Sequence, residues 1–196
     1  MTFYRYENGA LNPVERQVVN EFPLRLLVNG QELATLVASQ HQLNYLIAGF
    51  CRMQGFVHGL EDILSLGICQ EFGAAHVRLR GKIPERLQPI LTSGCGSGIV
   101  FGPLRLLKNR QRIISSIAPE AVIELMQALT RKAEKYQSHG GIHSAAVGDS
   151  ENLILYAEDL GRHNTLDRIA GEALFRDMEL SGKILVTSGR ISTEMV

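Results

Sequence analysis

The chain has 196 residues, enough for one large domain, and its 45% apolar and 20% charged residues are ordinary for a soluble globular protein. Twenty basic and twenty acidic residues cancel, so no net charge attracts nucleic acid or an anionic membrane. No apolar run is long enough for a transmembrane helix, and the N-terminus lacks the apolar core of a signal peptide. Three widely spaced cysteines do not make a disulfide framework, so we expect a cytoplasmic, reducing location.

The N-terminal half is predicted to be rich in β-strands. Asn29-Gly30, a preferred pair for a two-residue type I′ turn, separates apolar strands at 24–28 and 32–37. A further strand is expected at 14–19. The elements that follow are predicted as a helix from Gln40 to Gly55, a helical turn at 59–63, and strands at 63–71 and 75–80.

The C-terminal half is predicted to alternate helices and strands. A helix is expected from Pro119 to Tyr136, ended by Gly140-Gly141. Its buried stripe is expected to consist of Val122, Met126, Leu129, Ala133 and Tyr136. The later elements are expected as strands at 142–147 and 153–156, a helix with Asn164 as N-cap, and a buried, parallel strand at 183–187.

This order of elements predicts an α/β layered fold. We divide the chain into an N-terminal β-hairpin-rich lobe at 1–90, a connector at 91–118 and an α/β half at 119–196, together one integrated domain. A helix that starts at Ser192 or Thr193 would end after one turn and be marginal. We therefore expect the chain to be truncated at its C-terminus.

The central stretch Thr92-Ser93-Gly94-Cys95-Gly96-Ser97-Gly98 surrounds one thiol with small residues. Glycines let successive backbone N–H groups form an anion-binding nest, which lowers the pKa of a thiol held there and makes it more reactive. A turn that merely contains a cysteine is the alternative. Cys51 and Cys69 lie in apolar patterns, so we expect them to be buried and inert. The cysteines are too far apart for a zinc site with paired ligands, and we expect no metal.

Three further polar clusters fall at the predicted ends of elements, at 140–144, 158–164 and 187–190. Arg162, His163 and Arg190 beside glycines and helix N-termini suit phosphate groups. The alternative is a surface with capping residues and a solvated ion pair between Glu158 or Asp159 and Arg162.

These four clusters resemble the signature blocks of the formate dehydrogenase accessory sulfurtransferase (FdhD/NarQ) family in sequence, order and spacing. The resemblance covers nearly all of the chain and is carried by Thr92-Ser93-Gly94-Cys95-Gly96, Gly140-Gly141-Ile142-His143, the run from Glu158 to Asp167, and Thr187-Ser188-Gly189-Arg190-Ile191-Ser192. It implies a cytidine-deaminase-like α/β fold. It also implies that Cys95 carries sulfur, as a persulfide, from a cysteine desulfurase to the bis-guanine-dinucleotide form of the molybdenum cofactor of formate dehydrogenase.

The residues expected to bind this guanine-nucleotide-containing cofactor are Gly94, Gly96, His143, Arg162, His163, Ser188 and Arg190. His143 is also a candidate proton shuttle. The expected partners are the desulfurase, the dehydrogenase and a second copy of the chain in a homodimer, with no nucleic acid and no membrane.

The chain departs from the family pattern at Gly98, where many members carry a second cysteine. Any sulfur transfer here would use one thiol. The zinc signature of the deaminases is absent, so deaminase activity is not implied. Two other functions remain open: a non-enzymatic chaperone for the cofactor, and a cysteine hydrolase that pairs Cys95 with His143 or His163.

Overall fold

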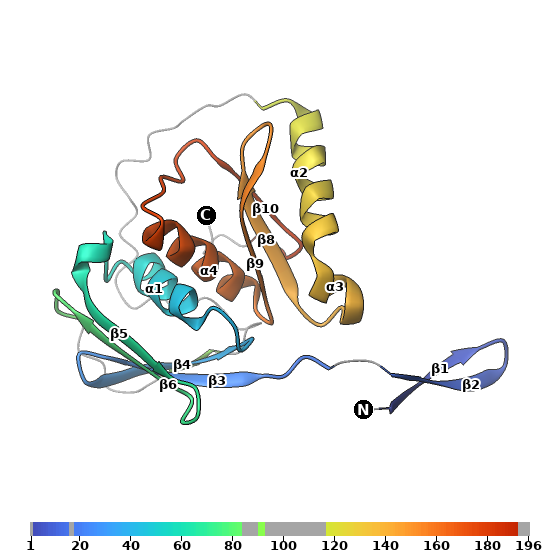
Figure 1. The fold of residues 1–196 in the computed structure, drawn as a ribbon, viewed down its shortest axis with the longest axis horizontal. Helices are drawn as coiled ribbons and strands as arrows, with labels where there is room; N and C mark the ends of the chain where they lie inside the picture. The colour runs from blue at the N-terminus through green and yellow to red at the C-terminus, as the bar shows by residue number, and fades with distance from the viewer. Residues whose placement is uncertain (1, 16–17, 84–89, 93–116, 192–196) are drawn as a thin grey trace.

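The computed structural model of this protein describes residues 2–15, 18–83, 90–92 and 117–191. Strands in these ranges form sheets of five, three and two strands. Figure 1 shows two helices, α1 (Leu43–Met53) and α4 (Arg162–Phe175), lying between the larger two sheets, with α2 (Pro119–Lys132) on the outer face of the second sheet. The arrangement is a mixed α/β fold in layers.

The five-stranded sheet is built around a β-hairpin. Its turn residues Asn29 and Gly30 have φ angles of 51° and 86°, the left-handed conformation that a type I′ turn requires, so this predicted turn is confirmed. The strand order is β5-β6-β3-β4-β7, in which β3–β6 and β4–β7 are parallel pairs and the other two pairs are antiparallel. The strands are β3 (Phe22–Val28), β4 (Gln31–Ala38), β5 (Ile63–Cys69), β6 (Ala74–Leu79) and β7 (Ile90–Thr92), with a short 3-10 helix at Leu60–Asp62.

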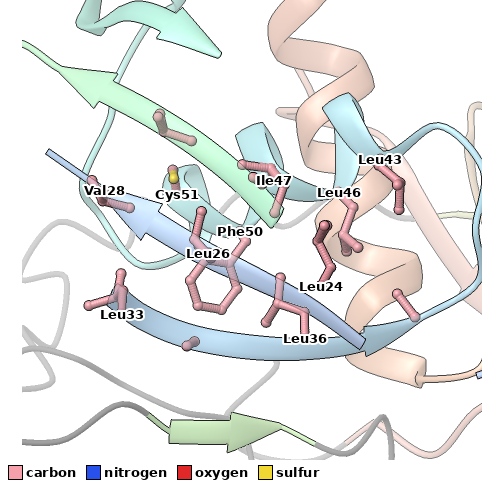
Figure 2. Close-up of a cluster of buried hydrophobic side chains, with 14 of the residues drawn as sticks. Leu24, Leu26, Val28, Leu33, Leu36, Leu43, Leu46, Ile47, Phe50 and Cys51 are labelled. Atoms are coloured by element: carbon pink, nitrogen blue, oxygen red, sulfur yellow. The ribbon is translucent and has the colours of Figure 1, made fainter. Parts of the chain in front are cut away.

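Helix α1 covers one face of this sheet and completes the main hydrophobic core. Leu46, Ile47 and Phe50 at helical spacing meet Leu24 and Leu26 of β3, all of them buried (Figure 2). The positive φ of Gly55 (72°) turns the chain two residues after the helix ends. The predicted helix and its apolar face are therefore confirmed.

The three-stranded sheet has β8 (His143–Gly148) at its centre, between β9 (Leu153–Asp159) and β10 (Ile184–Thr187). Both neighbours are antiparallel to β8. Consequently β9 and β10 end at the edge of the sheet where β8 begins. Helix α4 packs on one face and α2 on the other, followed by the short α3 (Glu134–His139).

Helices α1 and α4 cross at two glycines, which joins the two halves of the fold. A β-carbon on Gly49 would overlap the carbonyl oxygen of Asp167, and one on Gly171 would overlap the carbonyl oxygen of Tyr45. The two backbones are in direct contact, so neither position accommodates a side chain without moving the helices apart.

A second hairpin, β1 (Thr2–Glu7) and β2 (Ala10–Glu15), projects from the body in Figure 1 and exposes Tyr4, Tyr6 and Leu11. The strand predicted at 14–19 was wrong, because the strand here runs from Ala10 to Glu15 and pairs with β1. Asn8 and Gly9 form the turn with φ angles of 54° and 80°. An Asn-Gly pair, the signal that identified the hairpin of β3 and β4, was therefore also present in the sequence of this hairpin.

The helix predicted to begin at Pro119 needs two corrections. The helix predicted from Pro119 to Tyr136 breaks at Ala133, whose ψ angle of 63° is not helical. Its buried side chains are Ala121, Leu125 and Leu129. Of the predicted stripe, Leu129 and Ala133 are buried, whereas Val122, Met126 and Tyr136 are exposed.

The start of α4 and the pairing of β10 also differ from prediction. Helix α4 begins at Arg162 with Gly161 as N-cap, three residues before the expected N-cap, and Asn164 lies buried in its first turn. β10 was predicted to be a buried parallel strand. It is antiparallel to β8, and its Leu185 is exposed because it lies at an edge of the sheet.

Candidate functional site

Three polar clusters that are far apart in the sequence meet at one edge of the three-stranded sheet. His143 begins β8, Arg162 begins α4 just after β9, and Ser188 and Arg190 follow β10. The antiparallel pairing of β8 with both neighbours places these positions together, since the end of each outer strand lies beside the start of the middle one. Arg162 and Arg190 thus lie at the same edge of the sheet.

Gly189 lies at the centre of this edge. A β-carbon at this position would lie 2.9 Å from Cβ of Arg162 and 3.4 Å from Nδ1 of His143. The missing side chain is therefore what lets the arginine and the histidine approach the turn after β10.

Hydrogen bonds to β8 hold this turn in place. The N–H of Ser144 donates to Oγ of Ser188 at 2.9 Å, and the N–H of Ser188 donates to the carbonyl of Ser144 at 2.9 Å. The N–H of Gly189 donates to Oγ1 of Thr187 at 3.0 Å, and that hydroxyl donates to the carbonyl of Ser144 at 3.1 Å. The hydroxyl of Ser188 thus helps to hold the turn against β8, while the side chain of Arg190 is exposed.

The charges at this edge act on His143. Burial lowers the pKa of His143, the positive charges of Arg162 and Arg190 lower it further, and the carboxylate of Asp159 partly opposes them. The half-buried imidazole is accordingly neutral at neutral pH. A neutral imidazole can accept a proton or a hydrogen bond, so the group is suited to proton transfer at this edge.

Arg162 is the most deeply placed cation of the edge, only 9% exposed. Its Nε is buried and has no hydrogen-bond partner among the residues that the structure describes. The backbone N–H groups of the first turn of α4 add a partial positive charge beside it. His163 is half-buried at the second position of the same helix. Such an arrangement is suited to an anionic group.

Asp159 and Arg168 form the support beneath the edge. Asp159 is fully buried and accepts hydrogen bonds from Nε of Arg168 (2.8 Å), the side-chain amide of Asn164 (2.7 Å) and the N–H of Gly161 (3.2 Å). The alternative of a solvated ion pair between Asp159 and Arg162 is wrong, because the buried partner of Asp159 is Arg168. These contacts fix the turn from which Arg162 projects.

The same network reaches the N-terminal sheet. Arg168 donates to the carbonyl of Ser39 at 2.7 Å and to the carbonyls of His41 and Gln42, all just beyond β4. Asn164 donates to the carbonyl of Val37 at 2.9 Å. The end of β4 is therefore held against the start of α4.

This contact also locates the start of the glycine-rich loop. β7 runs parallel to β4 with Thr92 beside Leu36, so its C-terminal end points toward the same junction. The predicted site residues Gly94, Cys95 and Gly96 lie outside the described residues, and their roles stay predictions.

The two described cysteines differ from each other. Cys51 is fully buried in the main core (Figure 2), and burial together with the charge of Asp167 raises its pKa to about 12. This confirms Cys51 as a buried residue. Cys69 is only half-buried at the end of β5, so its predicted burial was wrong.

Two features of the site were not predicted from the sequence. Gly189 lay within a predicted cluster, but its role depends on the approach of α4, which no local pattern reveals. The pairing of Asp159 with Arg168 was also missed. Its signal was a carboxylate placed directly after an apolar strand, a position that is costly unless the charge is paired.

Three comparisons relate the chain to known proteins. The model of the FdhD/NarQ family matches residues 19–196. The chain is 35% identical over 201 residues to the sulfur carrier protein FdhD of Bacillus subtilis, covering 98% of this chain and 76% of that protein. It is 34% identical over 199 residues to the sulfur carrier protein FdhD of Staphylococcus aureus strain MRSA252, covering 98% of this chain and 75% of that protein.

The fold also resembles a solved structure. A crystal structure described as a formate dehydrogenase accessory protein from Desulfotalea psychrophila matches with a TM-score of 0.72 at 16% identity, covering 100% of this chain and 74% of that one. Within the described part of the chain, no helix is long and apolar enough to cross a membrane. In the same part, no three His, Cys, Asp or Glu side chains come together as a metal site would require.

Proposed function

Because the chain belongs to the FdhD/NarQ family, we propose that it is a sulfur carrier that serves the maturation of formate dehydrogenase. The names of its relatives support this role: curated proteins that are 33–35% identical over 98% of the chain are called sulfur carriers. The solved structure of similar fold is described as a formate dehydrogenase accessory protein.

We propose Cys95 as the carrier of the sulfur. Its thiolate attacks the terminal sulfur of a persulfide on a cysteine desulfurase. A sulfur–sulfur bond forms on Cys95, the sulfur–sulfur bond of the donor breaks, and the donor cysteine leaves as a thiolate. Gly98 provides no second thiol in the loop, so a single cysteine carries the sulfur in this chain.

The observation that carries the proposal is the direction of β7. Its last residue, Thr92, lies beside Leu36 of β4, whose end is bound to α4 through Val37 and Asn164. Three residues of chain span at most about 11 Å. We propose that Cys95, three residues beyond Thr92, delivers sulfur from this side to a ligand bound at the edge formed by His143, Arg162 and Arg190.

The ligand we propose for that edge is the bis-guanine-dinucleotide molybdenum cofactor, as the substrate that receives the sulfur. Two described residues suit this ligand. The buried Nε of Arg162 has no hydrogen-bond partner among the described residues, and Arg190 is exposed at the same edge. Guanidinium groups and a helix N-terminus suit phosphate oxygens. Arg162, His163, Ser188 and Arg190 would hold the phosphates, and His143 would exchange a proton with the bound group.

Three further properties belong to this proposal. We assign the layered fold to the cytidine-deaminase-like type, because a sheet with helices on both faces is consistent with it. We also propose a homodimer. A cytoplasmic location is in keeping with the few cysteines.

The test is mass spectrometry of the protein after incubation with a cysteine desulfurase and cysteine. We expect a gain of a single sulfur atom that is lost in Cys95→Ser and kept in Cys51→Ala and Cys69→Ala. A gain that persists in Cys95→Ser would exclude Cys95 as the carrier. Full support of formate dehydrogenase activity by Cys95→Ser would instead favour a chaperone that only holds the cofactor.

A further inference from the structure

We propose that the edge formed by His143, Arg162 and Arg190 binds oxyanions together with a proton, which His143 takes up from solvent when the anion binds. The inference rests on the proposed function in one respect, that this edge is where an anionic ligand binds. It adds a regulatory property of that site, because affinity then depends on pH in a defined direction.

The geometry brings the proton acceptor and the anion-binding groups together. The position of a β-carbon on Gly189 is 3.4 Å from Nδ1 of His143 and 2.9 Å from Cβ of Arg162. The imidazole and the base of the Arg162 side chain thus both pack against Gly189 at this edge. Arg162 has a buried Nε with no partner among the described residues, and it is the first residue of the fourteen-residue helix α4. An oxyanion bound by the guanidinium groups at this edge would also lie close to the imidazole, because both arginines act on His143.

The charged groups that face His143 come from each element packed around it. Arg162 belongs to α4, Arg190 follows β10, and Asp159 ends β9 beside His143 of β8. The two arginines disfavour a positive imidazole, and Asp159 favours it. Burial also keeps His143 neutral, so its pKa lies below the ordinary value in the free protein.

A bound oxyanion changes this balance. Its negative charge offsets the two guanidinium charges and acts directly on the imidazole, so the pKa of His143 rises when the anion is bound. Binding and protonation are then coupled, and the coupling is reciprocal. The anion raises the affinity of His143 for a proton, and the proton raises the affinity of the site for the anion by the same factor.

The expected size of the change in affinity with pH follows from this linkage. Each unit by which the anion raises the pKa of His143 makes binding about tenfold tighter at a pH below both pKa values than at a pH above them. We expect the affinity of the edge for the oxyanion to rise on the order of tenfold as the pH falls from about 8 to about 5.

The experiment uses sulfate, because sulfate itself does not titrate in this pH range. The C2–H resonance of His143 is followed by NMR against pH with and without saturating sulfate, and it is assigned by its loss in His143→Asn. We expect sulfate to shift the titration of His143 to higher pH. The resonance of His76, exposed on β6 of the other sheet, should follow the same curve with and without sulfate.

A second measurement is the dissociation constant of sulfate across the same pH range in the wild type and in His143→Asn. We expect the pH dependence to be lost in the variant. Sulfate that leaves the titration of His143 unmoved would overturn the proposal, as would equal affinity at both ends of the range. The wild-type titration alone decides the matter if the variant does not fold. Sulfur loading of Cys95 is measured separately, so failure of the proton coupling is distinct from failure of the sulfur-carrier function.

Discussion

Gly189 packs against Arg162 so closely that a β-carbon at position 189 would lie 2.9 Å from Cβ of the arginine. Real β-carbons do not approach other atoms this closely, so either the turn after β10 or the start of α4 would have to move. The two elements carry the two arginines of the candidate site. The spacing of this site is therefore set by a single glycine.

The first prediction concerns Gly189→Ala. We expect the added methyl group to displace Arg162 and His143. Binding of a guanine nucleotide should then weaken by about tenfold or more, because a charge-assisted hydrogen bond lost from the arginine contributes roughly 1.5–3 kcal/mol. Calorimetric titration of the nucleotide measures the effect. The matched control is Gly67→Ala, an exposed position on β5 where an added β-carbon has no neighbour within 4 Å. Unchanged nucleotide affinity in Gly189→Ala would show that this edge does not bind the ligand.

The second prediction concerns Arg190, which is exposed and can be changed without disturbing the core. Charge-assisted hydrogen bonds contribute roughly 1.5–3 kcal/mol, so Arg190→Ala should weaken guanine nucleotide binding by about tenfold or more. Arg190→Lys should keep only part of the wild-type affinity for the nucleotide, because an ammonium group cannot bind phosphate oxygens in a bidentate manner.

Persulfide formation on Cys95 provides the control in the same protein. It should be equal in the wild type and in Arg190→Ala, because the arginine acts on the acceptor ligand and not on the sulfur donor. A second control is Arg176→Ala, at the other end of α4, where the arginine is paired with Glu172. If Arg190→Ala and Arg176→Ala bind the nucleotide equally well, Arg190 is not part of the site.

Local patterns in the sequence predicted most of the regular elements and placed the polar clusters at the ends of strands. Asn29-Gly30 defines its own turn, and the helical spacing of Leu46, Ile47 and Phe50 identifies the buried face of α1. Arg162 and Arg190 each follow a predicted strand, and residues that follow strands of the same direction lie at one edge of a sheet.

The errors arose where a distant contact decides between local alternatives. Helix α2 carries apolar residues on more than one face, and its packing on the second sheet buries Leu125 while leaving Met126 exposed. Asn164 has the side chain of an N-cap, but its amide binds Asp159 and Val37, and the N-cap is Gly161, three residues earlier. Such choices depend on contacts between elements, such as that of Asn164 with Val37, and cannot be predicted from the local sequence.

The third prediction concerns the reactivity of the cysteines. Burial and the nearby charge of Asp167 raise the pKa of Cys51 to about 12, so Cys51 has almost no thiolate in the native protein at pH 8. We expect iodoacetamide to modify the half-buried Cys69 at least about tenfold faster than Cys51. Mass spectrometry of peptides after timed alkylation measures both rates. Unfolding in denaturant should make the rates similar, and equal rates in the native protein would contradict the burial of Cys51.

The last prediction is a pH dependence of stability that comes from Asp167. Burial, followed by the charge of Asp159, raises the pKa of Asp167 to about 8, while Arg168 partly opposes this shift. The folded protein therefore holds a proton that the unfolded chain releases above about pH 4. The stability from this proton is complete below that pH and is lost as the pH rises toward 8, by up to roughly 1.4 kcal/mol per pH unit.

Asp167→Asn replaces the protonated carboxyl with a neutral group of similar shape, so it should remove this dependence. The measurement is urea unfolding of both proteins at several pH values from about 5 to about 8. We expect the free energy of unfolding of Asp167→Asn to increase steadily relative to that of the wild type as the pH rises, because only the wild type must keep a proton to remain folded. Asp177→Asn, at an exposed carboxyl just beyond α4, should keep the pH dependence of the wild type. A difference between Asp167→Asn and the wild type that stays constant with pH would show that Asp167 does not titrate in this range.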